Sequence, residues 1–167
     1  KKLYTQINST TGQKIISTHS PYIAAVAELG QIRNFYKGKV DISVGRIKIS
    51  ELDKEAIRKI ERQVINTRGE LFFSKLLVFF EGDTEEQALP IFAEYYYKKS
   101  PVEKGFDFIG IGGHKSYLPF LRFTESLKIP WVIFSDGEPT VVKSVKNQIQ
   151  NSKTIRVRDF SRYRQQF

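Results

Sequence analysis

The sequence of 167 residues contains no cysteine and no methionine. Without cysteine, the protein has no disulfide, no zinc–thiolate site and no cysteine nucleophile, a composition that suits a reducing cytoplasm. Because a complete gene product begins with methionine, we expect the chain to be a piece of a longer polypeptide. Apolar runs stay well below the roughly 20 residues that cross a membrane, and no signal-peptide pattern is present. We therefore expect a cytoplasmic protein without a membrane partner.

Acidic residues are outnumbered, with 18 Asp and Glu against 27 Lys and Arg, which gives a formal charge of +9. This excess favours a polyanionic partner such as DNA. It is strongest from residue 143 to 167, where seven basic residues accompany one acid; the seven are Lys143, Lys146, Lys153, Arg156, Arg158, Arg162 and Arg164. We interpret this stretch as a track for the DNA backbone, with a solvated helix face as the alternative.

The first third of the chain predicts short, mixed elements. The β-branched run at residues 14–16 predicts a buried strand, and Pro21 is suited to begin a helix. The other expected elements are a helix at 22–29, strands at 31–36 and 41–49, and an exposed charged helix from Ser50 to about residue 66.

After residue 67 the pattern changes to alternating strands and helices. The expected strands are 76–80, 106–109, 131–134 and 154–157, and the expected helices are 83–98, 116–128 and 139–151. Such alternation predicts an α/β fold with a parallel sheet and helices on both faces. We therefore divide the chain into residues 1–67 and 68–167. In helix 83–98 we expect a buried stripe and a kink at Pro90; the stripe is Leu89, Phe92, Ala93 and Tyr96.

Acidic residues follow two of these strands, with Glu81 after the first and Asp136 after the third. The carboxyl ends of parallel strands share one edge of the sheet, so these carboxylates should meet there. Asp83, Glu85 and Glu86 are also explained by the dipole of the following helix, and for Glu86 we prefer that explanation. Crowded carboxylates need a cation between them, and a set of oxygen ligands favours Mg²⁺ or Mn²⁺.

A glycine-rich turn at residues 110–115 follows the second strand. It is equally explained by a tight turn that needs positive φ and by a loop that approaches a phosphate. In the second case Lys115 would pair with the phosphate and belong to the catalytic group. His114 is a weaker candidate for a general base, because the sequence shows no partner for it.

The arrangement of Glu81-Gly82 after one strand and Asp136-Gly137-Glu138 after another resembles the Toprim domain of topoisomerases, bacterial primases and several nucleases. The resemblance covers residues 71–151 and implies that Glu81, Asp136 and Glu138 bind metal. Glu138 departs from the Asp that the family carries at this position, and Glu85 would add a ligand. Ser135 would assist through its hydroxyl or carbonyl oxygen.

The segment Ile15-Ile16-Ser17-Thr18-His19-Ser20-Pro21 resembles the switch-histidine segment of ABC-type ATPases, in which the histidine meets the γ-phosphate of ATP. An ABC-type segment followed by a Toprim-like domain resembles the OLD (overcoming lysogenisation defect) family of ATP-dependent endonucleases, which includes the nuclease subunit of Gabija-type antiphage systems. The resemblance implies that His19 contacts ATP, that the protein is a dimer or tetramer, and that a helicase-like protein is a partner. No phosphate-binding Gly-x-x-x-x-Gly-Lys-[Ser/Thr] loop occurs in this chain, so ATP would bind only in the full-length protein.

These patterns together predict a metal-dependent DNA endonuclease, controlled by an attached ABC-type ATPase, in antiphage defence. Two alternatives remain open. One is a primase, topoisomerase or DNA-repair use of the same domain, and the other is a non-catalytic module that binds metal and DNA.

Overall fold

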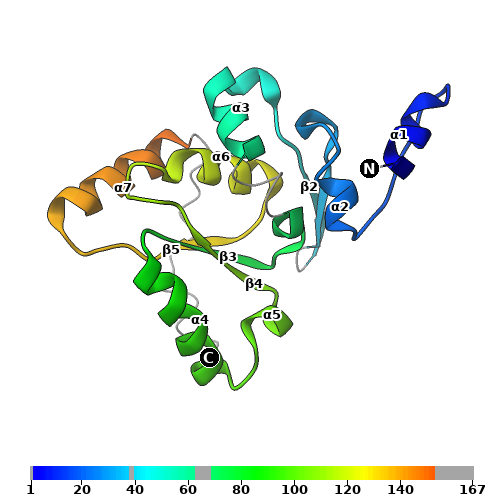
Figure 1. Ribbon diagram of the computed structural model, residues 1–167. Coiled ribbons are helices and arrows are strands. Elements are labelled where there is room, and N and C mark those ends of the chain that lie inside the picture. Colours follow the sequence, from blue (N-terminus) through cyan, green and yellow to red (C-terminus); the bar gives the residue numbers. More distant parts are fainter. Residues whose placement is uncertain (1, 38–39, 63–68, 153–167) are drawn as a thin grey trace.

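The computed structural model describes residues 2–37, 40–62 and 69–152, and within these the central element is a three-stranded parallel sheet (Figure 1). Strand β3 (Leu76–Phe80) lies between β4 (Phe106–Gly110) and β5 (Trp131–Ile133). Val78 stands opposite Phe108 on one side and Val132 on the other. The predicted strands 76–80, 106–109 and 131–134 are confirmed to within one residue, and so is their parallel pairing.

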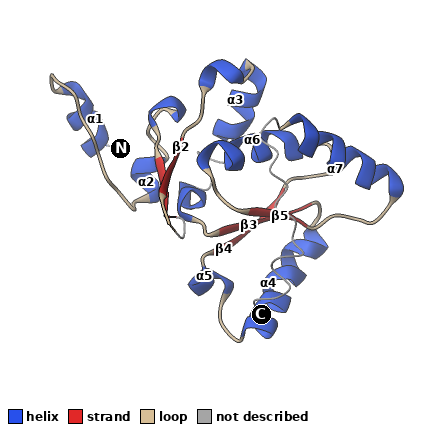
Figure 2. Cartoon of the chain, turned by 180° about the vertical axis from the view of Figure 1, so that it is seen from behind, coloured by secondary structure: helices blue, strands red, loops and turns tan. Residues whose placement is uncertain are grey.

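Helices cover both faces of this sheet, as predicted (Figures 1 and 2). Helices α6 (Tyr117–Leu127) and α7 (Pro139–Asn151) lie on one face, and α4 (Asp83–Tyr97) and α5 (Pro101–Lys104) lie on the other. Helix α6 forms the largest part of the core with six buried residues: Tyr117, Phe120, Leu121, Phe123, Thr124 and Leu127. Strand β3 is apolar throughout because it is covered on both sides.

The prediction of a buried stripe on α4 is wrong. No residue of this fully described helix is buried, and Phe92 and Tyr96 are 65% and 66% exposed. The half-buried face runs instead through Leu89, Ala93 and Tyr97, spaced by four residues, with the Tyr97 ring against Phe106 of β4 at 5.5 Å. The periodicity therefore identified Leu89 and Ala93 correctly. It also predicted burial of Phe92 and Tyr96, whereas the packing face continues to Tyr97. The helix continues through Pro90.

The amino-terminal residues form α1 (Lys2–Ser9), α2 (Pro21–Ala24), the 3₁₀ helices η1 (Leu29–Gln31) and η2 (Ile49–Glu51), and a hairpin of β1 (Asn34–Lys37) and β2 (Ile42–Gly45). Helix α3 (Lys54–Ile60) begins at Asp53, whose side chain accepts a hydrogen bond from the Ala56 amide at 2.7 Å. The 3₁₀ helix η4 (Gly69–Phe73) then leads into β3. The two strands expected at 31–36 and 41–49 are confirmed with shorter bounds, and the structure pairs them antiparallel.

Two expected elements are absent from the described residues. Residues 14–16 form no strand, and Ile15 and Ile16 are 92% and 40% exposed, so this run lacks the burial that favours β-branched residues in a sheet. The single helix expected at 22–29 is replaced by α2 and η1. The strand expected at 154–157 and the boundary between residues 67 and 68 lie outside the described residues.

One hydrophobic core joins the two parts of the chain. Ala24, Leu29, Ile47 and Ile60 from the amino-terminal part belong to the same cluster as the buried residues of β3 and α6. In the described ranges, no helix is both long enough and apolar enough to cross a membrane.

Candidate functional site

The candidate site lies at the carboxyl edge of the sheet. Beyond the strands, the Ile111 amide donates a hydrogen bond to the Phe80 carbonyl at 2.9 Å, and the Phe134 amide donates to the Phe79 carbonyl at 2.8 Å. These bonds hold the three chain segments together as they leave the sheet. The residues that follow, among them Glu81, His114 and Asp136, therefore emerge at one edge.

Glu81 is the most enclosed acidic residue of this edge, with a side chain only 16% exposed. The Tyr117 hydroxyl donates a hydrogen bond to its Oε1 at 3.4 Å, and His114 Nδ1 lies 4.0 Å from its Oε2. Burial raises the pKa of Glu81, the charges of Asp136 and Glu85 raise it further, and Tyr117 and His114 oppose that rise. The ionised form of Glu81 is thus disfavoured without a nearby cation.

Tyr117 occupies the first turn of α6 and is completely buried. Its pKa is raised strongly, chiefly by burial and then by the negative charge of Glu81, with smaller contributions from Asp136 and Glu85. The phenol therefore stays protonated and acts as a hydrogen-bond donor to Glu81. The charges of Glu81, Asp136 and Glu85 all contribute to raising this pKa, as expected for acids that follow strands at one edge of the sheet.

The other predicted site residues lie around this group. Asp136 is exposed, Ser135 is half-buried, and Glu138 is the exposed N-cap residue of α7. Glu85 reaches back over Gly82 in the first turn of α4. Within the described part of the chain, Ser135, Glu138 and Lys115 make no hydrogen bond or ion pair with Glu81.

The glycine-rich turn holds His114 between β4 and α6. Gly112 and Gly113 have φ angles of +69° and +118°, so the tight-turn explanation accounts for both glycines. The Ser116 amide closes the turn on the Gly113 carbonyl at 3.0 Å. Lys115 is exposed next to His114, so a role toward phosphate stays a prediction.

His19 lies away from the acidic edge. The exposed imidazole packs against the Phe73 ring in a tilted arrangement, with an interplanar angle of 41° and ring centroids 5.7 Å apart. The Ser20 amide donates to Thr18 Oγ1 at 2.9 Å, which gives this loop a local turn. Phe73 precedes β3 and Glu81 follows it, so His19 is placed toward the opposite end of that strand.

The donor chemistry of this edge fits a hard divalent cation, because its donors are carboxylate oxygens and because burial, followed by the charges of Asp136 and Glu85, raises the pKa of Glu81. The described side chains do not form a ready-made cluster of three such ligands. Asp136 and Glu85 would have to move toward Glu81 to bind one ion; Asp136 is exposed in a loop, and Glu85 is half-buried in the first turn of α4.

Sequence reasoning missed Tyr117 as a site residue and gave His114 little weight. Tyr117 stands among the aromatic residues of an amphipathic helix, which look like core residues in a sequence. The one available signal was position, because the first turn of the helix after a glycine-rich loop lies at the ligand-binding edge of a parallel sheet.

Residues 72–137 match the family model for the "Overcoming lysogenization defect protein-like, TOPRIM domain". The matched segment begins before β3 and ends just after Asp136, so it contains Glu81, Glu85, His114 and Tyr117. No curated protein sequence matches the chain significantly. The family match supports an OLD-type Toprim domain in this segment. Toprim domains are typically catalytic, bind divalent metals such as Mg²⁺, and indicate a nuclease- or primase-type function.

Proposed function

We propose that the protein is a divalent-metal-dependent DNA endonuclease. The observation that carries the proposal is Glu81, an enclosed carboxylate with a raised pKa, at the same sheet edge as Asp136 and Glu85 and inside the segment that matches the Toprim model. Glu81 and Asp136 would hold Mg²⁺ or Mn²⁺, with Glu85, Glu138 and Ser135 as further oxygen donors. The ion would neutralise charge that develops on the phosphodiester and lower the pKa of a water molecule.

The chain's own groups would orient Glu81 in this reaction. Tyr117 donates to one carboxylate oxygen from a buried position, and His114 faces the other oxygen. Both contacts restrict the rotation of the Glu81 side chain and direct it to the sheet edge. A carboxylate held in this way loses less entropy when it binds an ion.

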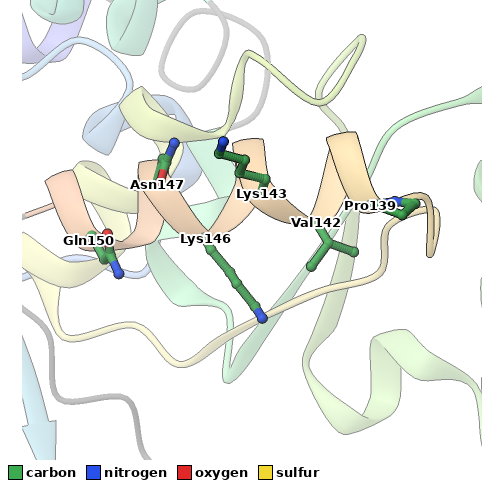
Figure 3. A pocket seen from close by; sticks show the side chains of 6 residues that line it. All are labelled: Pro139, Val142, Lys143, Lys146, Asn147 and Gln150. Carbon is green, nitrogen blue, oxygen red and sulfur yellow. The ribbon is translucent and has the colours of Figure 1, made fainter.

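The DNA backbone would lie along α7, which begins directly after Glu138. A shallow groove on this helix is lined by Pro139, Val142, Lys143, Lys146, Asn147 and Gln150 (Figure 3). The lining holds two exposed lysines and no acidic residue. Lys143 and Lys146 belong to the basic track predicted from the sequence, whose other five residues lie outside the described part. Phosphate contacts along this helix would position DNA without selecting a sequence.

Reversing the charge of Lys143 and Lys146 to Glu should weaken DNA binding equally for unrelated sequences. The slope of log K against log salt should decrease by about two units, because each lost phosphate contact removes about one unit of counterion release. Fluorescence anisotropy at several salt concentrations measures this slope. The matched control reverses the exposed Lys54 and Lys99, which changes the net charge equally. If both double variants change the slope equally, the groove on α7 has no special role.

The test of the proposed function is nicking of supercoiled plasmid with and without Mg²⁺ or Mn²⁺. An endonuclease should leave ends that ligase can rejoin, with no covalent protein–DNA adduct. A covalent adduct would identify topoisomerase chemistry, and primer synthesis would identify a primase. Binding of metal and DNA without any cleavage would identify a regulatory module.

We further propose that residues 1–67 are the end of an ABC-type ATPase that controls cleavage in a cytoplasmic antiphage system, as an oligomer with a helicase-like partner. The segment from Ile15 to Pro21 supports this proposal through its resemblance to a switch-histidine segment. ATP would then bind with His19 near its γ-phosphate in the full-length protein. The exposed position of the His19 ring is compatible with contact to a ligand.

Replacing His19 with Ala in the full-length protein should reduce ATP hydrolysis, or the effect of ATP on nicking, by roughly 100-fold or more, the lower end of the range for loss of a group that acts in proton transfer. The fold should be preserved, because the imidazole is exposed and packs against the Phe73 ring. ATP turnover and nucleotide-dependent nicking measure the effect, and thermal unfolding serves as the control. Normal turnover together with normal nucleotide control would contradict a switch role for His19.

A further inference from the structure

Gln148 on α7 lies against the loop that carries His114, and its role is not explained by the DNA groove. We propose that Gln148 is a positioning residue that sets the geometry of His114 and Tyr117 around Glu81. This inference rests on the proposed function, because it assigns a second layer of support to the same site.

Gln148 uses both ends of its side-chain amide on this loop. Its Nε2 donates a hydrogen bond to the His114 carbonyl at 2.6 Å, and its Oε1 accepts one from the Leu118 amide at 3.0 Å. One half-buried side chain therefore bridges two backbone groups four residues apart. His114 is the first of these residues, and Tyr117 directly precedes the second.

The bond to Leu118 replaces a helix cap. Ser116 is the N-cap residue of α6, and within the described residues its side chain makes no cap hydrogen bond. The amide of Leu118, at the second helical position, would therefore lack an acceptor from the local chain. Gln148 supplies that acceptor from another helix. The start of α6, and with it Tyr117, is thus fixed by α7.

The bond to His114 adds to the local hydrogen bond, from the Ser116 amide to the Gly113 carbonyl, that closes this turn. Gly112 and Gly113 precede His114 with positive φ angles and allow many backbone conformations. Ser144, one turn before Gln148 on α7, adds a second donor to the His114 carbonyl at 3.3 Å. Gln148 Nε2 also lies 3.4 Å from Ser144 Oγ, so the two side chains are linked.

The residues that face Glu81 are His114, which Gln148 bonds directly, and Tyr117, which directly precedes the bonded Leu118. Tyr117 donates to Oε1 of this carboxylate and His114 Nδ1 lies near Oε2. A shift of the loop away from α7 would displace both groups together. Glu81 would then lose the two contacts that direct its carboxyl group, which is the effect expected when a supporting shell around a metal ligand is removed.

Replacing Gln148 with Met tests this inference, because Met has a similar length and makes neither hydrogen bond. We expect faster hydrogen exchange of the Leu118 amide and shifted NMR signals of the Tyr117 ring. Affinity for Mn²⁺ should decrease by roughly 10-fold, the lower end of the range for outer-shell partners. The kcat for plasmid nicking should decrease while KM for DNA stays unchanged, because the groove lysines are untouched.

Asn151→Met is the control, since Asn151 is exposed at the end of the same helix and does not line the groove. It should leave Leu118 exchange and Mn²⁺ affinity at their normal values. Gln148→Glu retains an acceptor for the Leu118 amide but places a carboxylate against the His114 carbonyl. In this variant the Leu118 amide should exchange as slowly as in the unmodified protein. The comparison with Gln148→Met therefore distinguishes the hydrogen bond to Leu118 from the hydrogen bond to His114.

Unchanged Leu118 exchange and Mn²⁺ affinity in Gln148→Met would overturn the inference. A lower unfolding temperature with unchanged Mn²⁺ affinity would also overturn it, because that result describes a merely structural residue. If the unmodified protein neither binds Mn²⁺ nor nicks DNA, the proposed function fails instead. In that case loss of Leu118 protection and shifted Tyr117 signals would still support the role of Gln148 in placing these groups.

Discussion

Replacing Glu81 with Gln or Asp136 with Asn should abolish metal-dependent nicking while the protein without metal stays as stable as before or becomes slightly more stable. Each amide removes a negative charge that an Mg²⁺ or Mn²⁺ ion would bind. We expect nicking to decrease by roughly 100-fold or more, the scale for losing a group that stabilises charge in the transition state. Plasmid nicking and thermal unfolding, each with and without metal, are the measurements.

The stability of the metal-free variants follows from the electrostatics of the site. Burial and the neighbouring carboxylates raise the pKa of Glu81, so the folded state disfavours its ionised form. Free energy of unfolding in the metal-free protein therefore decreases as pH rises from the ordinary carboxyl pKa through the raised one. Glu81→Gln removes this loss, and the amide oxygen still accepts the hydrogen bond from Tyr117.

Binding of metal should separate the unmodified protein from these variants. At a metal concentration about 100 times Kd, ligand linkage adds about 2.7 kcal/mol to the free energy of unfolding. The amide variants should lose most of that increase. Asp41→Asn and Glu103→Gln are matched controls, since both are exposed acids away from the sheet edge. Variants that unfold early, yet nick normally after correction for the folded fraction, would show that Glu81 and Asp136 form a structural cluster.

The elements that place these two acids could be predicted because their sequence signals are local. Strand β3 is a continuous apolar run, and α7 begins at Pro139, which suits a first helical position. Parallel pairing then places Glu81 and Asp136 at the same edge. No local signal, however, distinguishes the sequence of a parallel strand from that of a loop rich in β-branched residues, such as residues 14–16. Whether such a segment forms a strand depends on whether a neighbouring strand pairs with it.

The surroundings of Glu81 could not be predicted for a different reason. Tyr117 and Gln148 reach the site from α6 and α7, and their contacts depend on how these two helices pack. Neither residue belongs to a motif, and each would be assigned to the core or the surface from sequence alone. The raised pKa of Glu81 likewise depends on burial by other parts of the chain, which no spacing of acids reveals.

The largest expected loss of stability comes from Gly45→Ala, at the end of β2. A Cβ atom on Gly45 would overlap the carbonyl carbon and oxygen of Leu127 and lie 2.6 Å from its Cα. These are backbone atoms at the end of α6, so no side chain can move aside. The hairpin must shift, and the hydrogen bond from Asn34 Nδ2 to the Leu127 carbonyl at 2.8 Å would be lost with it.

We expect Gly45→Ala to decrease the free energy of unfolding by about 3 kcal/mol, the upper range for overpacking a buried contact. For a chain of this size, such a loss lowers Tm by about 10 °C. Gly137→Ala is the matched control, because a Cβ there meets no atom within 4 Å. Asn34→Ala should cost about 1 kcal/mol through the lost hydrogen bond alone. A Tm for Gly45→Ala equal to that of the control would contradict the packing of the β1–β2 hairpin on α6, and with it the shared core of the two parts of the chain.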